Sequence, residues 1–174
     1  MGEISVLFLS GLILGIYLFI VSMIAIIIFY ILVSYIFESL AITSMSKNLK
    51  YKNVYTGWIP IYNKYILGRI AGSKPLGITL LITSLISTVT FVSLFILKEP
   101  LSVIVVILLL SVIITFILDI ILSHKIFSKY MDKYKDIMTI LSILSLGFLR
   151  PILLFIIRSK KEKSWANMNH YGNI

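Results

Sequence analysis

Long apolar runs dominate the chain, and their length and continuity predict helices. The first run covers residues 4–37 without a charged residue, the second covers residues 76–97, and the third covers residues 101–123. Each is long enough to cross a hydrocarbon core of about 30 Å, which requires about 20 helical residues. The apolar residues are continuous and do not alternate with polar ones, so a transmembrane β-barrel is not expected. The sequence therefore predicts three full transmembrane helices.

A fourth apolar stretch, residues 137–157, is interrupted by Arg150 and Pro151. Proline removes a backbone donor and disfavours helix at the preceding residue. An arginine at the centre of a bilayer costs about 2.5–3.5 kcal/mol on insertion scales. The stretch is either a fourth full span or a re-entrant C-terminal element that bends at these two residues. The predicted fold is an all-α polytopic membrane protein with a single membrane domain, residues 1–174.

Loop charges predict the orientation of the spans. The chain carries a net charge of +9, with six basic residues and no acidic residue between positions 39 and 75. Four more lysines lie between positions 124 and 136. By the positive-inside rule both loops are cytoplasmic and the N-terminus is outside. The basic tail, residues 158–174, also favours the cytoplasm, and a fourth full span would place it on the opposite side.

The amino-acid composition indicates the class of protein and argues against a metal or cofactor site. The chain is 59% hydrophobic and 13% charged, which is typical of an integral membrane protein. It has no cysteine and two histidines, so no metal site and no cofactor is expected.

The basic residues lie next to the predicted spans, which favours a phospholipid bilayer over nucleic acid as their partner. Ser123, His124 and Asp119 are close in sequence, but helical spacing directs the consecutive residues Ser123 and His124 to different sides, so catalytic residues are not expected. The isoleucine- and lysine-rich, arginine-poor composition suggests a bacterial source and the cytoplasmic membrane.

Aromatic and basic residues alternate in the segment 48–75 between the first two spans. Tyrosine and tryptophan favour the headgroup level of a bilayer, and lysine and arginine contact lipid phosphates. We expect residues 60–72 to form a helix in the cytoplasmic interface, with Pro60 in its first turn. The candidate residues for binding lipid or a partner are Trp58, Pro60, Tyr62, Asn63, Lys64, Tyr65 and Arg69.

Polar residues four positions apart mark the second and third spans. The two series are Thr79, Thr83 and Ser87 on one helix, and Ser111, Thr115 and Asp119 on the other. If the spans form a hairpin about Glu99, the two series lie at matching depths and face each other. Hydrogen bonding between the helices is the favoured interpretation of this polar seam. A proton or ion path with Asp119 as its titrating group is the alternative.

The segment GWIPIYNKYILGRIAG, residues 57–72, resembles the loop of small bacterial, Firmicute-like, multi-pass membrane proteins of unknown function. Their pattern is roughly W-x-A-x-I-P-I-Y-N-x-Y-x-L-x-K-I-x-G. The resemblance covers about residues 51–157, and Pro151 falls on a proline of the family's closing motif. Gly57 and Arg150 depart from the pattern, since an alanine and an aromatic residue are usual there. Some relatives are fused to signal-peptidase-like domains, which implies an association with secretion.

These features predict a non-enzymatic integral membrane protein that serves as an accessory, scaffold or partner-binding protein. The expected protein partner is another membrane protein or a second copy of the chain. The alternatives are an immunity protein against a membrane-active peptide and a small transporter or channel subunit. Ion flux that depends on Asp119 would favour the transporter. A neighbouring gene for a membrane-active peptide would favour the immunity protein.

Overall fold

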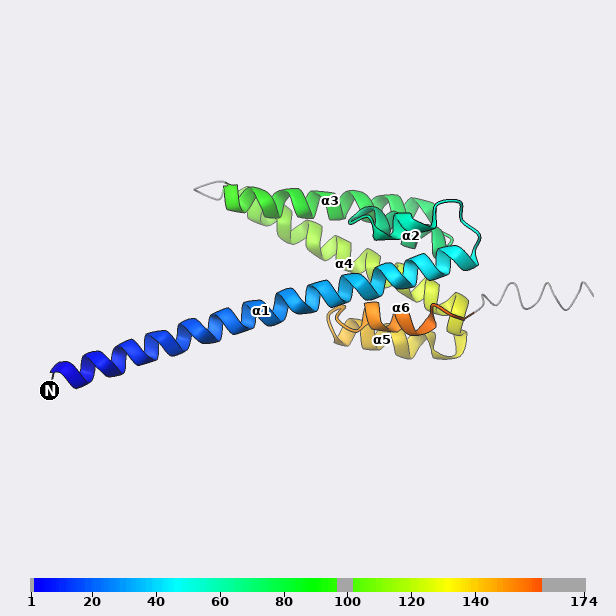
Figure 1. Cartoon of the computed structure of the whole chain (residues 1–174). Helices are drawn as coiled ribbons and strands as arrows, with labels where there is room; N and C mark the ends of the chain where they lie inside the picture. The colour runs from blue at the N-terminus through cyan, green and yellow to red at the C-terminus, as the bar shows by residue number, and fades with distance from the viewer. Residues whose placement is uncertain (1, 97–101, 161–174) are drawn as a thin grey trace, which may run out of the picture. The chain divides into compact units, whose positions relative to one another are not determined.

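The computed structural model describes residues 2–96 and 102–160, and these residues fold into helices joined by turns (Figure 1). The elements in chain order are α1 (Gly2–Asn48), a 3-10 helix η1 (Val54–Trp58), α2 (Tyr62–Ile70), α3 (Lys74–Ile96), α4 (Ser102–Met131), a 3-10 helix η2 (Asp132–Tyr134), α5 (Lys135–Leu144) and α6 (Arg150–Ile157). The all-helical fold class is confirmed for the described residues.

Three of the described helices are long and apolar enough to cross a membrane, as predicted. The first is α1, which continues past the end of the apolar run and ends at Asn48. The third is α4, which continues to Met131, beyond the predicted end at residue 123. Its last turns stay helical because Ile126, Phe127 and Tyr130 are buried there. The expected turn at residues 98–100 and the tail from residue 161 onward lie outside the described residues.

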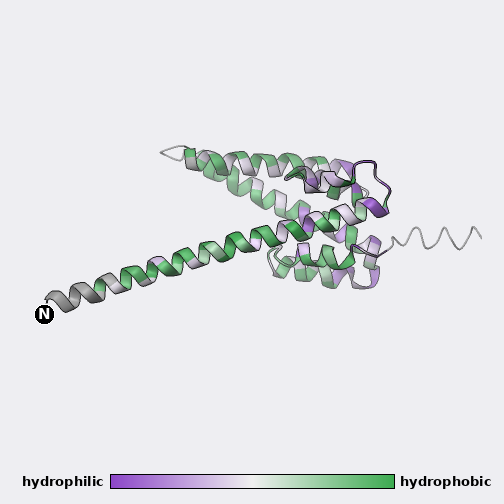
Figure 2. Cartoon of the chain, viewed as in Figure 1, coloured by the Kyte–Doolittle hydropathy of each residue, from purple (hydrophilic) through white to green (hydrophobic). Residues whose placement is uncertain are grey.

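The chain divides into two compact units, Met1–Ile36 and Phe37–Ile174. The described residues of the first unit all belong to α1. The second contains the last turns of α1 and every other element. Figure 2 shows that α3 and α4 are largely hydrophobic, whereas the end of α1 and the loop after it are hydrophilic. The features described below belong to the second unit.

The helix expected at residues 60–72 is present but shorter, because a tight turn at Ile61 precedes it. Ile61 has a φ of 66° and a ψ of −47°, the conformation of a γ-turn, and a positive φ is rare for a β-branched residue. The Tyr62 N–H donates to the Pro60 carbonyl at 2.7 Å, and α2 begins at Tyr62. Pro60 therefore lies in the turn before the helix, and its predicted place in the first helical turn is wrong.

The direction of α2 follows from the contacts at its two ends. In its first turn, Lys64 Nζ donates to Glu38 of α1 at 3.0 Å. At its other end, Lys129 of α4 donates to the Ile70 carbonyl at 3.1 Å, and the Tyr51 hydroxyl donates to the Arg69 carbonyl at 3.1 Å. The helix thus runs along α1 and α4, and it buries five of its nine residues. It is packed into the bundle more deeply than the sequence predicts.

Two glycines allow α2 to approach α3 closely. A Cβ placed on Gly77 would lie 2.9 Å from the Cα of Gly68 and 2.9 Å from the Tyr65 carbonyl oxygen. Both distances are too short for a real side chain, and the obstructing atoms are backbone. The two backbones are therefore in direct contact, which fixes α2 against the start of α3.

The stretch 137–157 forms two short helices. The helix α5 has 10 residues and α6 has 8. At 1.5 Å per residue they are about 15 and 12 Å long, so neither crosses a bilayer alone. The break lies at residues 145–149, where Leu146 and Gly147 have positive φ angles. The predicted bend at Arg150 and Pro151 is displaced, because both residues begin α6, where proline's missing donor is harmless.

The last turns of α1 lie beside α6 along its length. The rings of Phe37 and Phe155 have centroids 4.8 Å apart. Further along, the Asn48 side-chain amide donates to the Arg158 carbonyl at 3.2 Å. The two helices therefore run in the same direction and end close together.

We predict that Gly77→Ala destabilises the protein, because the new methyl group must push α2 away from α3. Overpacking of this kind costs about 1–3 kcal/mol. The thermal unfolding midpoint of the detergent-solubilised protein measures the effect. Thr88→Ala on the exposed side of α3 is the control and should leave the midpoint nearly unchanged. Equal midpoints for the two variants would show that the close contact does not hold α2 in place.

Candidate functional site

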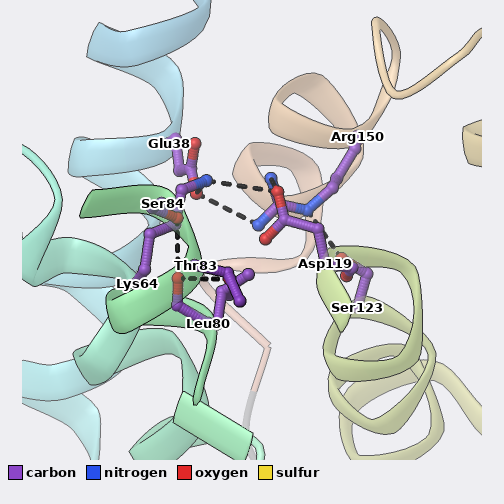
Figure 3. Close-up of polar contacts among 8 residues, drawn as sticks. All are labelled: Glu38, Lys64, Leu80, Thr83, Ser84, Asp119, Ser123 and Arg150. Atoms are coloured by element: carbon purple, nitrogen blue, oxygen red, sulfur yellow. Dashed lines mark hydrogen bonds and ion pairs between the residues drawn. The ribbon is translucent and has the colours of Figure 1, made fainter. Parts of the chain in front are cut away.

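Four charged side chains from four helices meet in a closed ring (Figure 3). Glu38 Oε1 accepts from Lys64 Nζ at 3.0 Å and from Arg150 Nη2 at 3.1 Å. Asp119 Oδ2 pairs with Lys64 Nζ at 3.3 Å and with Arg150 Nη1 at 3.0 Å. Acids and bases alternate around this charge ring, so it is formally neutral. It joins α1, α2, α4 and α6 at one point.

The charge ring is shielded from solvent by the helices around it. The exposed fraction of the side chain is 5% for Arg150, 9% for Glu38, 16% for Asp119 and 18% for Lys64. Removing charges from water costs several kcal/mol for each ion, and only close partners offset this cost. Each charged side chain of the ring therefore needs its partners in the ring to offset the free-energy cost of its burial.

Ser123 completes the environment of Arg150. The Arg150 Nε donates to Ser123 Oγ at 2.7 Å, and Ser123 Oγ donates to the Asp119 carbonyl at 2.7 Å. His124 does not join them, since its Nδ1 lies 2.9 Å from Thr139 Oγ1 of α5. The Ser–His–Asp group noted in the sequence is thus divided between two sets of contacts. This geometry does not place the histidine to activate the serine.

The first turns of the short helices α2 and α6 both lie at the charge ring. Lys64 lies in the first turn of α2, and Arg150 is the first residue of α6. A helix N-terminus carries a partial positive charge, which favours nearby carboxylates. Glu38 lies ten residues before the end of α1, about 15 Å along the helix. The ring therefore lies away from the ends of the two long helices, α1 and α4, and at the start of the two short ones.

The polar seam joins α3 and α4 directly at one level. Ser87 Oγ donates to Ser111 Oγ at 2.9 Å. Thr79 and Thr83 donate to carbonyl groups of their own helix instead. Asp119, at the end of the predicted series, belongs to the charge ring. Thr115 Oγ1 is buried and has no partner among the described residues.

The structure separates the candidate residues of the aromatic segment into two groups. Asn63 is buried and Lys64 belongs to the charge ring. Trp58 and Tyr62 are exposed, and the Tyr62 ring lies 5.4 Å from the Tyr65 ring. The last two candidate residues, Pro60 and Arg69, also lie outside the charge ring. Pro60 is exposed and Arg69 is partly buried.

Sequence reasoning missed Glu38 as a site residue, although a signal is present. Glu38 is the first charged residue after the 34 uncharged positions of the first run, and Arg150 is the one charge within the fourth apolar stretch. Charges of opposite sign isolated in apolar segments are candidates for pairing, because each is costly alone. The described residues contain no group of three histidine or acidic side chains that could hold a metal ion.

No protein-family model, curated protein or solved structure matches the chain. The resemblance of residues 51–157 to small bacterial membrane proteins therefore stays a prediction.

We predict that Arg150→Gln strongly destabilises the protein, because it leaves two buried carboxylates with one lysine. Breaking a buried ion pair costs about 3–5 kcal/mol. Adding Asp119→Asn restores neutrality, so the double variant should unfold at a higher temperature than Arg150→Gln alone. Thermal unfolding in detergent measures both.

The matched control is Lys135→Gln, which breaks a partly exposed pair with Asp132 at 3.0 Å. It should change the unfolding midpoint little, because water screens such pairs. Purely additive effects of Arg150→Gln and Asp119→Asn would contradict a coupled charge ring.

Proposed function

We propose that this chain is a non-enzymatic scaffold or accessory protein of the bacterial cytoplasmic membrane, which binds another membrane protein through its aromatic loop. The observation that carries this proposal is a contrast between two parts of the molecule. The buried charges neutralise one another within the bundle, whereas large aromatic side chains near η1 are exposed.

The charge ring supports a structural role. A catalytic or transporting carboxylate needs access to a substrate, an ion or a proton. Asp119 instead contacts both cations of the ring, and Arg150 is held further by Ser123. This arrangement suits a group that fixes helices in place.

The exposed aromatic surface consists of Tyr55, Trp58, Ile59 and Tyr62. Tyr55 is 82% exposed, the largest value among the exposed hydrophobic residues of the described chain. Tyrosine and tryptophan are enriched in protein interfaces, where they supply much of the binding energy. Gly57 holds this surface against α1, since a Cβ there would lie 2.9 Å from the Ile42 side chain. A surface fixed in this way is already shaped for a partner.

The same proposal includes a topology. The N-terminus is outside, α1, α3 and α4 cross the membrane, and α5 with α6 forms a re-entrant hairpin from the cytoplasmic side. This arrangement is supported by the short α5 and α6, and it leaves the basic residues after α6 on the cytoplasmic side. The helix α2 is a second short element that enters the bundle from that side. Its buried position satisfies the rule that irregular backbone at membrane depth must be covered by protein.

We predict that a cysteine at position 160 is on the cytoplasmic side. The chain has no native cysteine, so Lys160→Cys can be labelled alone with a membrane-impermeant thiol reagent. Lys52→Cys is the control for the inner face, and Lys98→Cys is the control for the outer face. We expect Lys98→Cys to react in intact cells and the other two to react only after permeabilisation. Reaction of Lys160→Cys in intact cells would show that the last apolar stretch crosses the membrane.

Photocrosslinking from the aromatic surface tests for the protein partner. A photoreactive amino acid replaces Tyr55 in living cells, and captured proteins are identified by mass spectrometry. The control is the same substitution at Tyr134, which is exposed in η2, a different part of the chain. We expect one membrane protein to be captured from position 55 and not from position 134. Capture of lipid alone, or of a second copy of the chain, would contradict the proposed role.

A further inference from the structure

Arg69, in the last turn of α2, holds its side chain in an unusual environment. Its guanidinium carbon lies 4.3 Å from the centre of the Tyr51 ring. The Tyr51 hydroxyl donates to the Arg69 carbonyl at 3.1 Å, so the two residues are held together at both ends. The Arg69 Nε is buried, yet no described residue accepts a hydrogen bond from it. A buried donor attached to a charged group is costly to leave unpaired.

Capping of α2 does not account for this arginine. Basic residues commonly neutralise the carbonyl groups at a helix C-terminus. In this helix Lys129 does so, because its Nζ donates to the Ile70 carbonyl at 3.1 Å. No acidic residue lies between positions 39 and 75, so none in this segment can pair with Arg69. The side chain is positioned by Tyr51, and no acidic side chain of residues 2–96 and 102–160 forms an ion pair with it.

A second cation lies at the same end of α2. A Cβ placed on Gly72 would lie 3.0 Å from Lys129 Nζ, and Gly72 has a φ of 77°. The glycine therefore makes the turn after α2 and leaves room for the lysine beside it. Arg69 and Lys129 together bring two positive charges to this turn.

These residues lie at the level where the membrane helices end. Tyr51 follows the end of α1 by three residues, and Lys129 precedes the end of α4 by two. For helices that cross a bilayer, this level coincides with the lipid headgroups. The headgroup region is rich in phosphate, an anion that a guanidinium binds in a bidentate geometry.

We propose that Arg69, oriented by Tyr51 and assisted by the charge of Lys129, is a binding site for a phosphate group. The guanidinium donates two hydrogen bonds to phosphate oxygens, and stacking on the tyrosine ring keeps its plane fixed. The phosphate is carried by a lipid headgroup or is free in solution. This site does not involve the aromatic surface, so it stands whether or not that surface binds a protein.

Lipid titration of the purified full-length chain tests the site. The probes are phosphatidylglycerol, diacylglycerol with the same acyl chains but no phosphate, and inorganic phosphate. Each is added to the detergent-solubilised protein, and the rise in thermal unfolding midpoint gives an apparent affinity. We expect phosphatidylglycerol to stabilise the chain more than diacylglycerol does. If inorganic phosphate competes with the lipid and gives the same stabilisation, the site takes free phosphate.

The variants distinguish a specific phosphate-binding site from general electrostatic attraction of the lipid to a basic surface. Arg69→Gln should weaken phosphatidylglycerol binding about tenfold, the expected effect of losing hydrogen bonds to a charged group. Lys52→Gln removes an equal charge from an exposed position of the same loop and should change binding less than about twofold. If Arg69→Gln does not fold, Arg69→Lys keeps the charge but loses the planar fork, and should also bind more weakly. Equal binding of the two lipids, or equal losses in Arg69→Gln and Lys52→Gln, would overturn the proposal.

Discussion

Charges placed in an apolar bundle must neutralise one another, and this constraint organises the second unit of the molecule. Glu38 and Asp119 come from helices long enough to cross a membrane. Lys64 and Arg150 come from helices too short to do so. The attraction between these groups draws both short helices into the bundle, where apolar packing against α1, α3 and α4 holds them.

The parts of the fold that sequence could predict are those set by local properties. The continuous apolar runs sufficed for α1, α3 and α4, because span length and helical spacing depend on neighbouring residues. The matched spacing of Ser87 and Ser111 placed them at the same level of two helices. By contrast, Glu38 and Arg150 are 112 residues apart, and no local pattern indicates that they meet. The same limit applies to α2, whose direction is decided by distant partners.

The two short helices resemble each other in how they reach the charge ring. Each follows a turn that contains positive φ angles, at Ile61 before α2 and at Leu146 and Gly147 before α6. Each then presents a cation in its first turn. A reversal of this kind allows a helix to begin inside the bundle and to leave on the side from which the chain entered. This geometry is what makes a re-entrant arrangement physically reasonable for both segments.

The position of Arg150 near the end of the chain has a consequence for biosynthesis. A ribosome makes Glu38, Lys64 and Asp119 before it makes Arg150, so the growing protein holds two carboxylates against one lysine from the synthesis of Asp119 until that of Arg150. Until Arg150 is made, this imbalance remains and the ring cannot close. The helix α6 is the last of the four ring helices to be made, and it supplies the cation that balances the ring.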